Sequence, residues 1–396
     1  LKARGDHTIL LIEHKLDELM HLIDRVVVLG EQGALLADGP PRTVFDRDYS
    51  RLRSQGVWTP QVVQLAHALR SQGLQLERVP VTLDEAESLL GNQLTSRQAR
   101  LANRSGQVDT GETDAPKPAT SPPAVEVRQL SYHVGSHPIL TEVTLAVQQG
   151  DFLAIVGANG AGKTTLAQHL AGILPSPPNT VLLHGKDLRQ LSALERSRQV
   201  GYVFQNPEHQ FVTGSVADEI RFGLRVMKLS ESEVTERADE LLARFNLARY
   251  ARANPFTLSH GEKRRLSVAT MLAMGQQILL LDEPTFGQDQ RNAAELLQLL
   301  SNLHQEGRTI ILITHDMALV AQYAQQVAVM SQGRLLAHDT VRVLFAQPDL
   351  LAAARLKPPP LAQLAGSGQP LLTVAEFVTN YSRARAGEDW PTHGVG

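Results

Sequence analysis

The residues best suited to chemistry form the glycine-rich run GANGAGKTT at residues 157–165, directly after the apolar segment 152–156. Glycines on both sides of such a turn let successive backbone N–H groups point at a phosphate, and the helix that follows adds the positive end of its dipole. Lys163 would then reach the β- and γ-phosphates, and the Thr164 hydroxyl would ligate Mg²⁺. We interpret the run as a P-loop nucleotide site rather than an incidental glycine-rich turn. Its candidate binding residues are Gly157, Asn159, Gly160, Gly162, Lys163, Thr164 and Thr165.

A second candidate lies where the apolar run 278–281 ends in two carboxylates, Asp282 and Glu283. Such a run is typical of a strand in a parallel sheet, and the carboxyl edge of that sheet is where α/β proteins bind ligands. Asp282 could hold Mg²⁺ through its water shell, and Glu283 could activate a water for attack on the γ-phosphate. The plain alternative is a strand that leaves the sheet in an acidic turn, which a P-loop in the same chain disfavours.

Further polar positions could belong to the same site. Ser259 and Gly261 stand at the predicted start of a helix that ends near Gly275, and a helix start can bind an anion. Gln205 and His315 each follow an apolar strand pattern. Taken singly, each of these residues has an ordinary explanation, as a helix cap, a polar strand end or a structural histidine.

The order of these motifs resembles the nucleotide-binding domains of ATP-binding-cassette (ABC) proteins, over about residues 125–345. The resemblance implies an α/β P-loop fold with a mainly parallel core sheet, an antiparallel β subdomain and a helical subdomain. It also implies ATP as the substrate and Mg²⁺ held by Thr164, Gln205 and Asp282. The chain would accordingly be an ATPase.

The resemblance also implies roles for single residues. Glu283, His315 and Gln205 are implied to be catalytic, with His315 as the switch histidine on the γ-phosphate and Gln205 as the Q-loop glutamine near Mg²⁺ and water. Asp289 is implied to be the D-loop acid. Ser259 and Gly261 belong to the signature, residues 258–262, which meets the ATP of a facing domain. A second ATPase domain or chain is therefore an implied partner.

Two features depart from the family pattern. The signature carries His260 where glycine is usual and Glu262 where glutamine is usual. The position of the aromatic residue that stacks on adenine is matched by Val134, with Tyr132 two residues earlier on the same predicted strand face. We therefore expect Tyr132 to substitute for the stacking ring.

Within the family, the segments 205–211, 258–265 and 283–289 resemble the ATPases of energy-coupling-factor importers. Those systems take up vitamins or metal ions and drive a separate membrane component. The resemblance thus implies an integral membrane partner, docked near residues 208–215, and a peripheral place on the cytoplasmic face of a bacterial-type membrane. The run 205–211 further suggests a thiamine or pyrimidine-precursor importer.

Composition leaves two other functions to consider. A non-transport ABC ATPase acting on ribosomes or DNA would carry a positive patch, whereas the net charge here is −3, so we expect no nucleic-acid partner. An inactive ATP-binding fragment is suggested by the altered signature. The chain has no cysteine, which excludes disulfides and thiolate metal sites, and no apolar run or leader of the kind that enters a membrane.

An internal repeat predicts the domain organisation. The segment 7–14 matches 308–315, each a buried-strand pattern that ends in histidine and precedes an amphipathic helix, and residues 26–29, 33–36 and 60–66 have counterparts at 327–330, 333–336 and 359–365. We expect 1–90 to be the C-terminal fragment of a first ATPase domain, 91–124 a flexible linker, 125–345 a complete domain and 346–396 a C-terminal extension. We also expect a longer parent protein, because the chain starts without Met.

Overall fold

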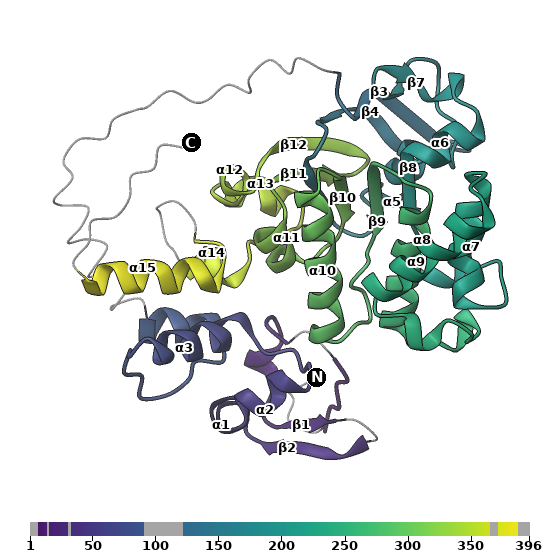
Figure 1. Ribbon diagram of the computed structural model, residues 1–396. Helices are drawn as coiled ribbons and strands as arrows, with labels where there is room; N and C mark the ends of the chain where they lie inside the picture. The colour runs from purple at the N-terminus through teal and green to yellow at the C-terminus, as the bar shows by residue number, and fades with distance from the viewer. Residues whose placement is uncertain (1–6, 14–15, 31–32, 91–121, 365–370, 387–396) are drawn as a thin grey trace. The chain divides into compact units, whose positions relative to one another are not determined.

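The computed structural model describes residues 7–13, 16–30, 33–90, 122–364 and 371–386 (Figure 1). Contacts group the chain into two compact units. The larger unit holds residues 116–288 and 292–357, and the smaller holds 1–115, 289–291 and 358–396. Most of the predicted linker lies outside the described residues, so the four proposed domain ranges stay predictions.

The larger unit is built on a six-stranded sheet with the order β12-β11-β5-β10-β9-β8. Five of these strands run parallel and β12 is antiparallel to β11, which confirms the predicted α/β class with a mainly parallel sheet. The central strands are buried on both faces, as their unbroken Val, Ile and Leu content requires. The bounds are β5 Phe152–Val156, β8 Val200–Val203, β9 Ile278–Asp282, β10 Thr309–Ile313, β11 Gln326–Ser331 and β12 Arg334–Thr340.

A four-stranded antiparallel sheet with the order β4-β3-β6-β7 forms the predicted β subdomain. Its apolar face shares one buried cluster with helix α5 (Lys163–Leu170) and one face of the central sheet, through residues such as Val127, Leu166 and Ile155. The first strand, β3, continues into a hairpin with β4. The bounds are β3 Val125–Val134, β4 His137–Val147, β6 Val181–Leu183 and β7 Lys186–Asp187.

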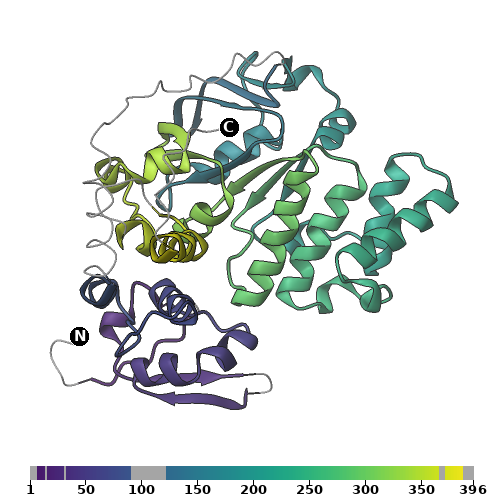
Figure 2. The same cartoon turned by 60° about the vertical axis from the view of Figure 1, so that its left-hand side comes forward.

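Helices cover the opposite face of the central sheet and form the predicted helical subdomain (Figure 2). Serine side chains cap three of these helices, at Ser215, Ser230 and Ser259, and each accepts a hydrogen bond from the first turn. Helix α9 ends just before Gly275, whose φ of +76° suits a helix stop. The main helices are α7 Val216–Val226, α8 Glu231–Arg244, α9 His260–Ala273, α10 Gln290–Gln305 and α11 Met317–Tyr323.

Short helices connect these parts of the larger unit. They comprise the α-helices α6 Ala193–Gln199, α12 Val341–Phe345 and α13 Pro348–Ala353, and the 3-10 turns η4 Leu188–Gln190, η5 Pro207–Gln210, η6 Ala248–Tyr250 and η7 Pro255–Thr257. Among the described helices, none combines the length and apolarity needed to cross a bilayer.

In the smaller unit, the hairpin of β1 (Val26–Leu29) and β2 (Leu35–Gly39) repeats that of β11 and β12. Both hairpins are antiparallel, and both shift register at equivalent places, between Val28 and Leu29 and between Val329 and Met330. The short helices α1 Pro41–Arg47 and α2 Tyr49–Ser54 pack on β1 and β2 around Val44 and Phe45.

The expectation of a buried strand at the start of the chain is wrong. Residues 7–13 form no strand, and Leu10 and Ile12 are 86% and 90% exposed. In the matching place of the repeat, β10 lies between β5 and β9, and the smaller unit contains no counterpart of these two strands among its described residues. Without such partner strands, the backbone N–H and C=O groups of the segment have no ladder to join. The expected helix after it shortens to the turn η2 (Met20–Leu22), and His14 lies outside the described residues.

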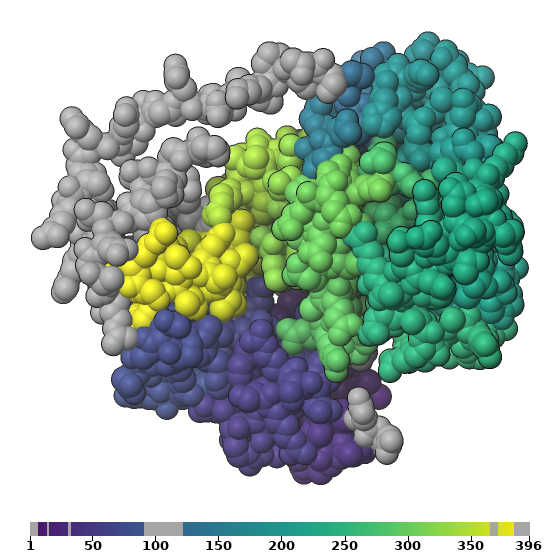
Figure 3. Space-filling model, viewed as in Figure 1, coloured from purple at the N-terminus to yellow at the C-terminus, as the bar shows by residue number. Residues whose placement is uncertain are grey.

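The C-terminal extension packs on its own repeat counterpart within the smaller unit. Helix α3 (Gln61–Ser71) contacts α14 (Pro360–Leu364) and α15 (Val374–Ala386), as Figure 3 shows for the yellow and blue helices. Leu65, Leu69 and Phe377 are almost completely buried between them, together with residues of a further helical segment at 83–90. Apolar burial of this kind stabilises by about 25 cal/mol per Å².

We predict that Phe377→Ala destabilises the smaller unit by about 3–5 kcal/mol, because the cavity adds to the lost transfer free energy. Urea unfolding followed by Trp58 fluorescence, in a background with Trp390→Phe, measures the change. Leu35→Ala is the control within the same unit, since Leu35 is 58% exposed on β2 and its loss should cost less than about 0.5 kcal/mol. Equal effects of the two substitutions would contradict the packing described here.

Candidate functional site

Four parallel strands end at one edge of the central sheet. In register, Ile313 of β10 pairs with Ile155 of β5 and with Asp282 of β9, and Val203 of β8 pairs with Leu281. The P-loop follows β5, Gln205 follows β8, Glu283 follows β9 and His315 follows β10. The sequence-predicted residues therefore leave the sheet at one level, at the carboxyl edge where α/β folds bind ligands.

The P-loop backbone depends on glycine at two positions. Gly157 has φ +155°, and a Cβ there would lie 2.3 Å from the Met330 carbonyl oxygen. Gly162 has φ +96°, and its Cβ would lie 2.9 Å from a methyl group of Leu140. A side chain at either position would force the loop to move. Asn159 and Gly160 are exposed at the tip of the loop, and Thr165 is half-buried in the first turn of α5.

Lys163 folds back over the loop from the first residue of α5. Its Nζ donates to the carbonyl oxygens of Gly157, at 2.8 Å, and of Ala158, at 3.1 Å. Burial lowers the pKa of Lys163, while the nearby carboxylates Glu283 and Asp282 act in the opposite direction. The ammonium group is thus held where a phosphate could replace the two carbonyl partners.

Asp282 lies at the end of β9 with its side chain buried. The Tyr202 hydroxyl donates to its Oδ2 at 3.1 Å, and the Thr164 side chain hydrogen-bonds to the same carboxylate. Burial raises the pKa of Asp282 against these two hydrogen bonds, and burial likewise raises that of Tyr202. Oδ1 is buried without a hydrogen-bond partner. A carboxylate oxygen left unpaired beside a threonine hydroxyl fits a hydrated Mg²⁺, which prefers oxygen ligands.

Glu283 and His315 form a pair. A hydrogen bond of 2.8 Å joins His315 Nδ1 to Glu283 Oε1, although 32 residues separate them in the chain. Glu283 is buried and has φ +46°, a left-handed conformation that is uncommon for residues other than glycine. Such backbone strain is frequent at functional positions.

Gln205 has an exposed side chain. Its backbone carbonyl accepts a hydrogen bond from Arg264 of α9. Arg264 donates to the carbonyls of Phe204, Gln205 and Glu283. Burial lowers the pKa of Arg264 to about 10, and the guanidinium stays charged at neutral pH. Gln205 and Glu283 are therefore connected through one side chain.

The signature residues form the start of α9. Ser259 Oγ accepts a hydrogen bond from the Glu262 N–H, and the Ser259 N–H donates to Glu262 Oε2 at 2.8 Å, which together make a capping box. A Cβ on Gly261 would lie 2.7 Å from the Asn292 side chain, so a larger residue here would force that side chain to move. Within the described part of the chain, neither Ser259 nor Gly261 hydrogen-bonds to the P-loop. The structure thus brings together the strand-end residues but not the signature.

The charge of Glu262, one of the departures from the family pattern, is compensated locally. Arg249 lies 3.7 Å from its Oε1 and stacks on the Tyr250 ring at 4.6 Å, and the Tyr250 side chain hydrogen-bonds to Glu262. Burial would raise the pKa of Glu262, but hydrogen bonds from Tyr250 and Ser259 lower it below its ordinary value. The carboxylate of Glu262 therefore serves the helix cap. His260 is the other residue that departs from the family pattern, and burial lowers its pKa.

Tyr132 and Val134 differ in burial, although both lie on β3. The register shift between Tyr132 and His133 comes from an extra residue in β4, Ile139, so the shared face of Tyr132 and Val134 and the stacking role of Tyr132 stay predictions. Tyr132 packs inward on the buried His169, with ring centroids 4.7 Å apart, whereas Val134 is 57% exposed. Tyr132 is therefore engaged in the core of the β subdomain.

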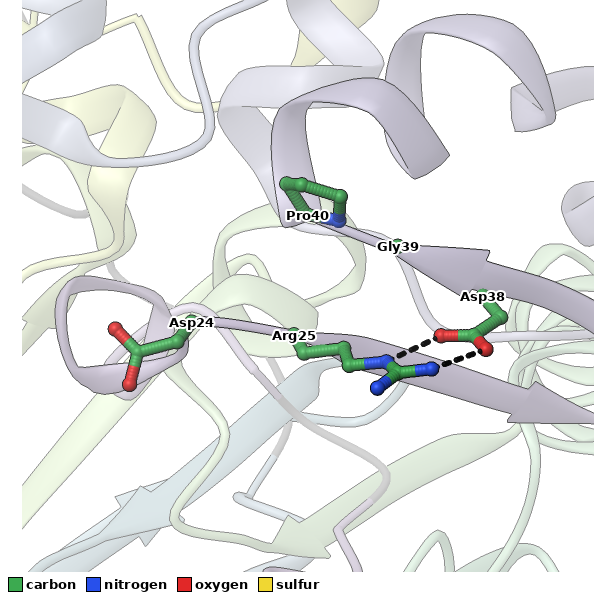
Figure 4. Close-up of a pocket in the computed structure, with 5 residues that line it drawn as sticks. All are labelled: Asp24, Arg25, Asp38, Gly39 and Pro40. Atoms are coloured by element: carbon green, nitrogen blue, oxygen red, sulfur yellow. Dashed lines mark hydrogen bonds and ion pairs between the residues drawn. The ribbon is translucent and has the colours of Figure 1, made fainter.

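Other expected or missed residues complete the description. Asp289, the expected D-loop acid, groups with the smaller unit. Two residues that contact the site, Tyr202 and Arg264, were not predicted from the sequence. The features that could have indicated them are a tyrosine within the apolar strand 200–203 and an arginine on the apolar side of α9. A hollow in the smaller unit is lined by Asp24, Arg25, Asp38, Gly39 and Pro40 (Figure 4). There the Arg25 guanidinium donates two hydrogen bonds of 2.7 Å to the two carboxylate oxygens of Asp38.

We predict that Glu262→Gln lowers the free energy of unfolding by about 0.5–1 kcal/mol at pH 7, because glutamine keeps the cap but loses the ionic hydrogen bonds. The folded-state pKa of Glu262 lies below the unfolded value of about 4.3, so its contribution is complete above that pH and disappears as the pH falls through the folded pKa. Urea unfolding at several pH values between about 7 and 3 measures the difference. Glu142→Gln, at an exposed position, is the control, and a pH-independent difference for Glu262→Gln would refute the assignment.

Comparison with known proteins agrees with this geometry. The pattern of the family described as ABC transporter matches residues 140–286. A putative ABC transporter ATP-binding protein of Methanosarcina acetivorans is 36% identical over 98% of this chain and 64% of its own length. The putative HMP/thiamine import ATP-binding protein YkoD of Bacillus subtilis is 36% identical over 88% of this chain and 58% of its own length.

Among solved structures, cbiO1 of Clostridium perfringens, described as part of the ABC transporter complex cbiONQ, is 32% identical. It aligns with a TM-score of 0.53 over 58% of this chain and 94% of its own. The chain spans less than two thirds of the length of the two relatives named above. The motif order, the strand-end geometry and these likenesses lead to one conclusion: the chain belongs to the ABC transporter family of ATP-binding-cassette proteins.

Proposed function

We propose that this chain binds and hydrolyses ATP to drive an importer in a membrane. The observation that supports it best is the set of strand ends at which Lys163 and Thr164 meet Asp282, and Glu283 meets His315. Phosphoryl transfer depends mainly on positioning and electrostatic stabilisation, which such a set of groups supplies.

In this proposal the P-loop residues bind the phosphates. Lys163 exchanges its two carbonyl partners for phosphate oxygens. Backbone N–H groups of the glycine-rich turn would donate to the same anion. Thr164, Asp282 and Gln205 would hold Mg²⁺, which neutralises phosphate charge when bound. The free Oδ1 of Asp282 and the exposed side chain of Gln205 are the groups available for this role.

Glu283 is the proposed general base. Its carboxylate is held by the hydrogen bond to His315, and it accepts the proton of a water that attacks the γ-phosphate. The side chain of His315 is about half exposed, so it can turn toward the phosphate while keeping its place beside Glu283.

A second copy of the ATPase domain completes each site. Ser259 and Gly261 make no hydrogen bond to the P-loop within the described residues, and their helix start can bind an anion that another chain presents. The smaller unit offers no P-loop or signature of its own among its described residues, so the facing domain is a second chain or a part of a longer parent protein.

The partner that the ATPase drives is an integral membrane protein. Val212 is 69% exposed in the proposed docking region 208–215, and Phe222 and Phe256 are also exposed on the helical subdomain, whereas Phe211 is buried against Phe256. The names of the relatives, one for HMP/thiamine import and one for a cbiONQ complex, support an energy-coupling-factor importer for a vitamin or a metal ion. Docking to such a partner would place the chain on the cytoplasmic face of the membrane.

We predict that Glu283→Gln lowers ATP turnover by about 10²-fold or more and leaves ATP binding nearly unchanged, because it removes the base and keeps the shape. Lys163→Ala should abolish binding. Steady-state hydrolysis and titration with a fluorescent ATP analogue measure the two effects. The exposed Glu306→Gln and Lys186→Ala are matched controls. Normal turnover in Glu283→Gln would defeat its role, and binding without turnover in the unaltered chain would favour the inactive-fragment alternative.

We also predict that two inactive variants restore activity when mixed. Lys163→Ala lacks a phosphate site, whereas Ser259→Asp keeps a helix cap but places a carboxylate where a phosphate would arrive. In a symmetric dimer, random pairing makes about half of all dimers mixed, and one of the two sites in each mixed dimer is intact, so about a quarter of normal activity should return. Hydrolysis assays of 1:1 mixtures measure it. No recovery at high protein concentration would contradict sites shared between chains.

A further inference from the structure

Arg264 is the largest completely buried side chain among the described residues. A buried cation is normally paired with a carboxylate, because its desolvation is costly otherwise. The terminal nitrogens of Arg264 donate to main-chain carbonyls instead. Nη1 donates to Phe204, and Nη2 donates to Gln205 and, at 3.3 Å, to Glu283.

These carbonyls belong to two different strand ends. Phe204 and Gln205 follow β8, whereas Glu283 follows β9, and Arg264 itself lies on α9, about one turn beyond Ser259 and Gly261. A single guanidinium therefore joins three segments that each carry a residue of the proposed mechanism. The planar fork of arginine fixes the direction of each carbonyl as well as its distance, which the point charge of lysine does not.

The neighbouring arginine shows that this arrangement is specific to one position. Arg265 directs its Nη1 to the side chains of Asn292 and Glu295 on α10, at 3.3 and 3.2 Å. It attaches α9 to another helix, whereas Arg264 attaches α9 to the edge of the sheet. Asp282 and Glu283 also attract the Arg264 charge, so the cation lessens the repulsion between these two carboxylates.

We propose that Arg264 is a positioning residue that couples the signature turn to Gln205 and Glu283, so that a displacement of any one of these segments moves the other two. The proposal deepens the function proposed above and rests on it. Arg264 touches no phosphate, and it acts through the backbone from which Gln205 and Glu283 extend. Contact of the signature with a facing ATP is thereby communicated to the attacking water and to the region where a membrane partner docks.

The test compares Arg264→Gln and Arg264→Lys with Arg308→Gln in the full chain. Arg308 is a matched control, because its Nη1 also donates to two main-chain carbonyls, those of Gly275 and Gln276, ahead of β9. We expect Arg264→Gln to lower kcat about tenfold or more while the KM for ATP and the dissociation constant of a fluorescent ATP analogue change less than about threefold. Arg264→Lys should be intermediate, and Arg308→Gln should resemble the unaltered chain.

Hydrogen exchange supplies a readout that does not need activity. In Arg264→Gln, amides of residues 204–208 and 258–263 should exchange faster together, while those of the P-loop keep their rates. Equal kcat in Arg264→Gln and Arg308→Gln would overturn the proposal, as would a parallel loss of nucleotide binding and turnover. If Arg264→Gln does not fold, Arg264→Lys decides by the same criteria. Absence of hydrolysis by the unaltered chain would sink the proposed function, and the exchange experiment would still decide the coupling.

Discussion

The parallel register of β10 with β5 and β9 is the constraint on which the site depends. Because Ile313 pairs with both Ile155 and Asp282, three segments leave the sheet at the same level. Side chains alternate along a strand, so a shift of one residue would turn Asp282 to the other face and move Glu283 away from His315. The apolar strands on both sides hold this register through burial, since their side chains fill the two cores of the larger unit.

Burial then sets the electrostatics. Lys163, Asp282, Glu283 and Arg264 are all nearly excluded from water, where charges interact more strongly than at the surface. Desolvation lowers the pKa of Lys163 and raises the pKa of Asp282, which favours the neutral form of each group. The opposite charge of the other group acts against each shift. The Tyr202 hydroxyl occupies one oxygen of Asp282 and leaves the other open. The site is thus arranged for a ligand that brings both negative charge and a cation.

The sequence was sufficient to predict an element where its local pattern and its chemistry indicate the same structure. The strand, turn and helix of the P-loop, the strand that ends at Asp282 and the capped helix at Ser259 lie as predicted, because each is determined by residues close in the chain. It was insufficient where the outcome depends on distant partners. The run 7–13 reads like β10, yet it forms no strand, since sheet formation needs neighbours that its sequence does not reveal. The register shifts between β3 and β4 and the three-way contact of Arg264 likewise arise from tertiary packing.

The packing of α3 on α15 has a consequence for synthesis of the protein. Leu65 and Phe377 are neighbours in the fold but are separated by roughly 300 residues of chain. At 5–20 residues per second, a ribosome needs roughly 15–60 seconds to make that stretch. During this interval the apolar side of α3, with Leu65 and Leu69, has been made without the helix that later covers it. Until α15 has been translated, this apolar side of α3 is therefore a surface to which chaperones that recognise apolar segments can bind.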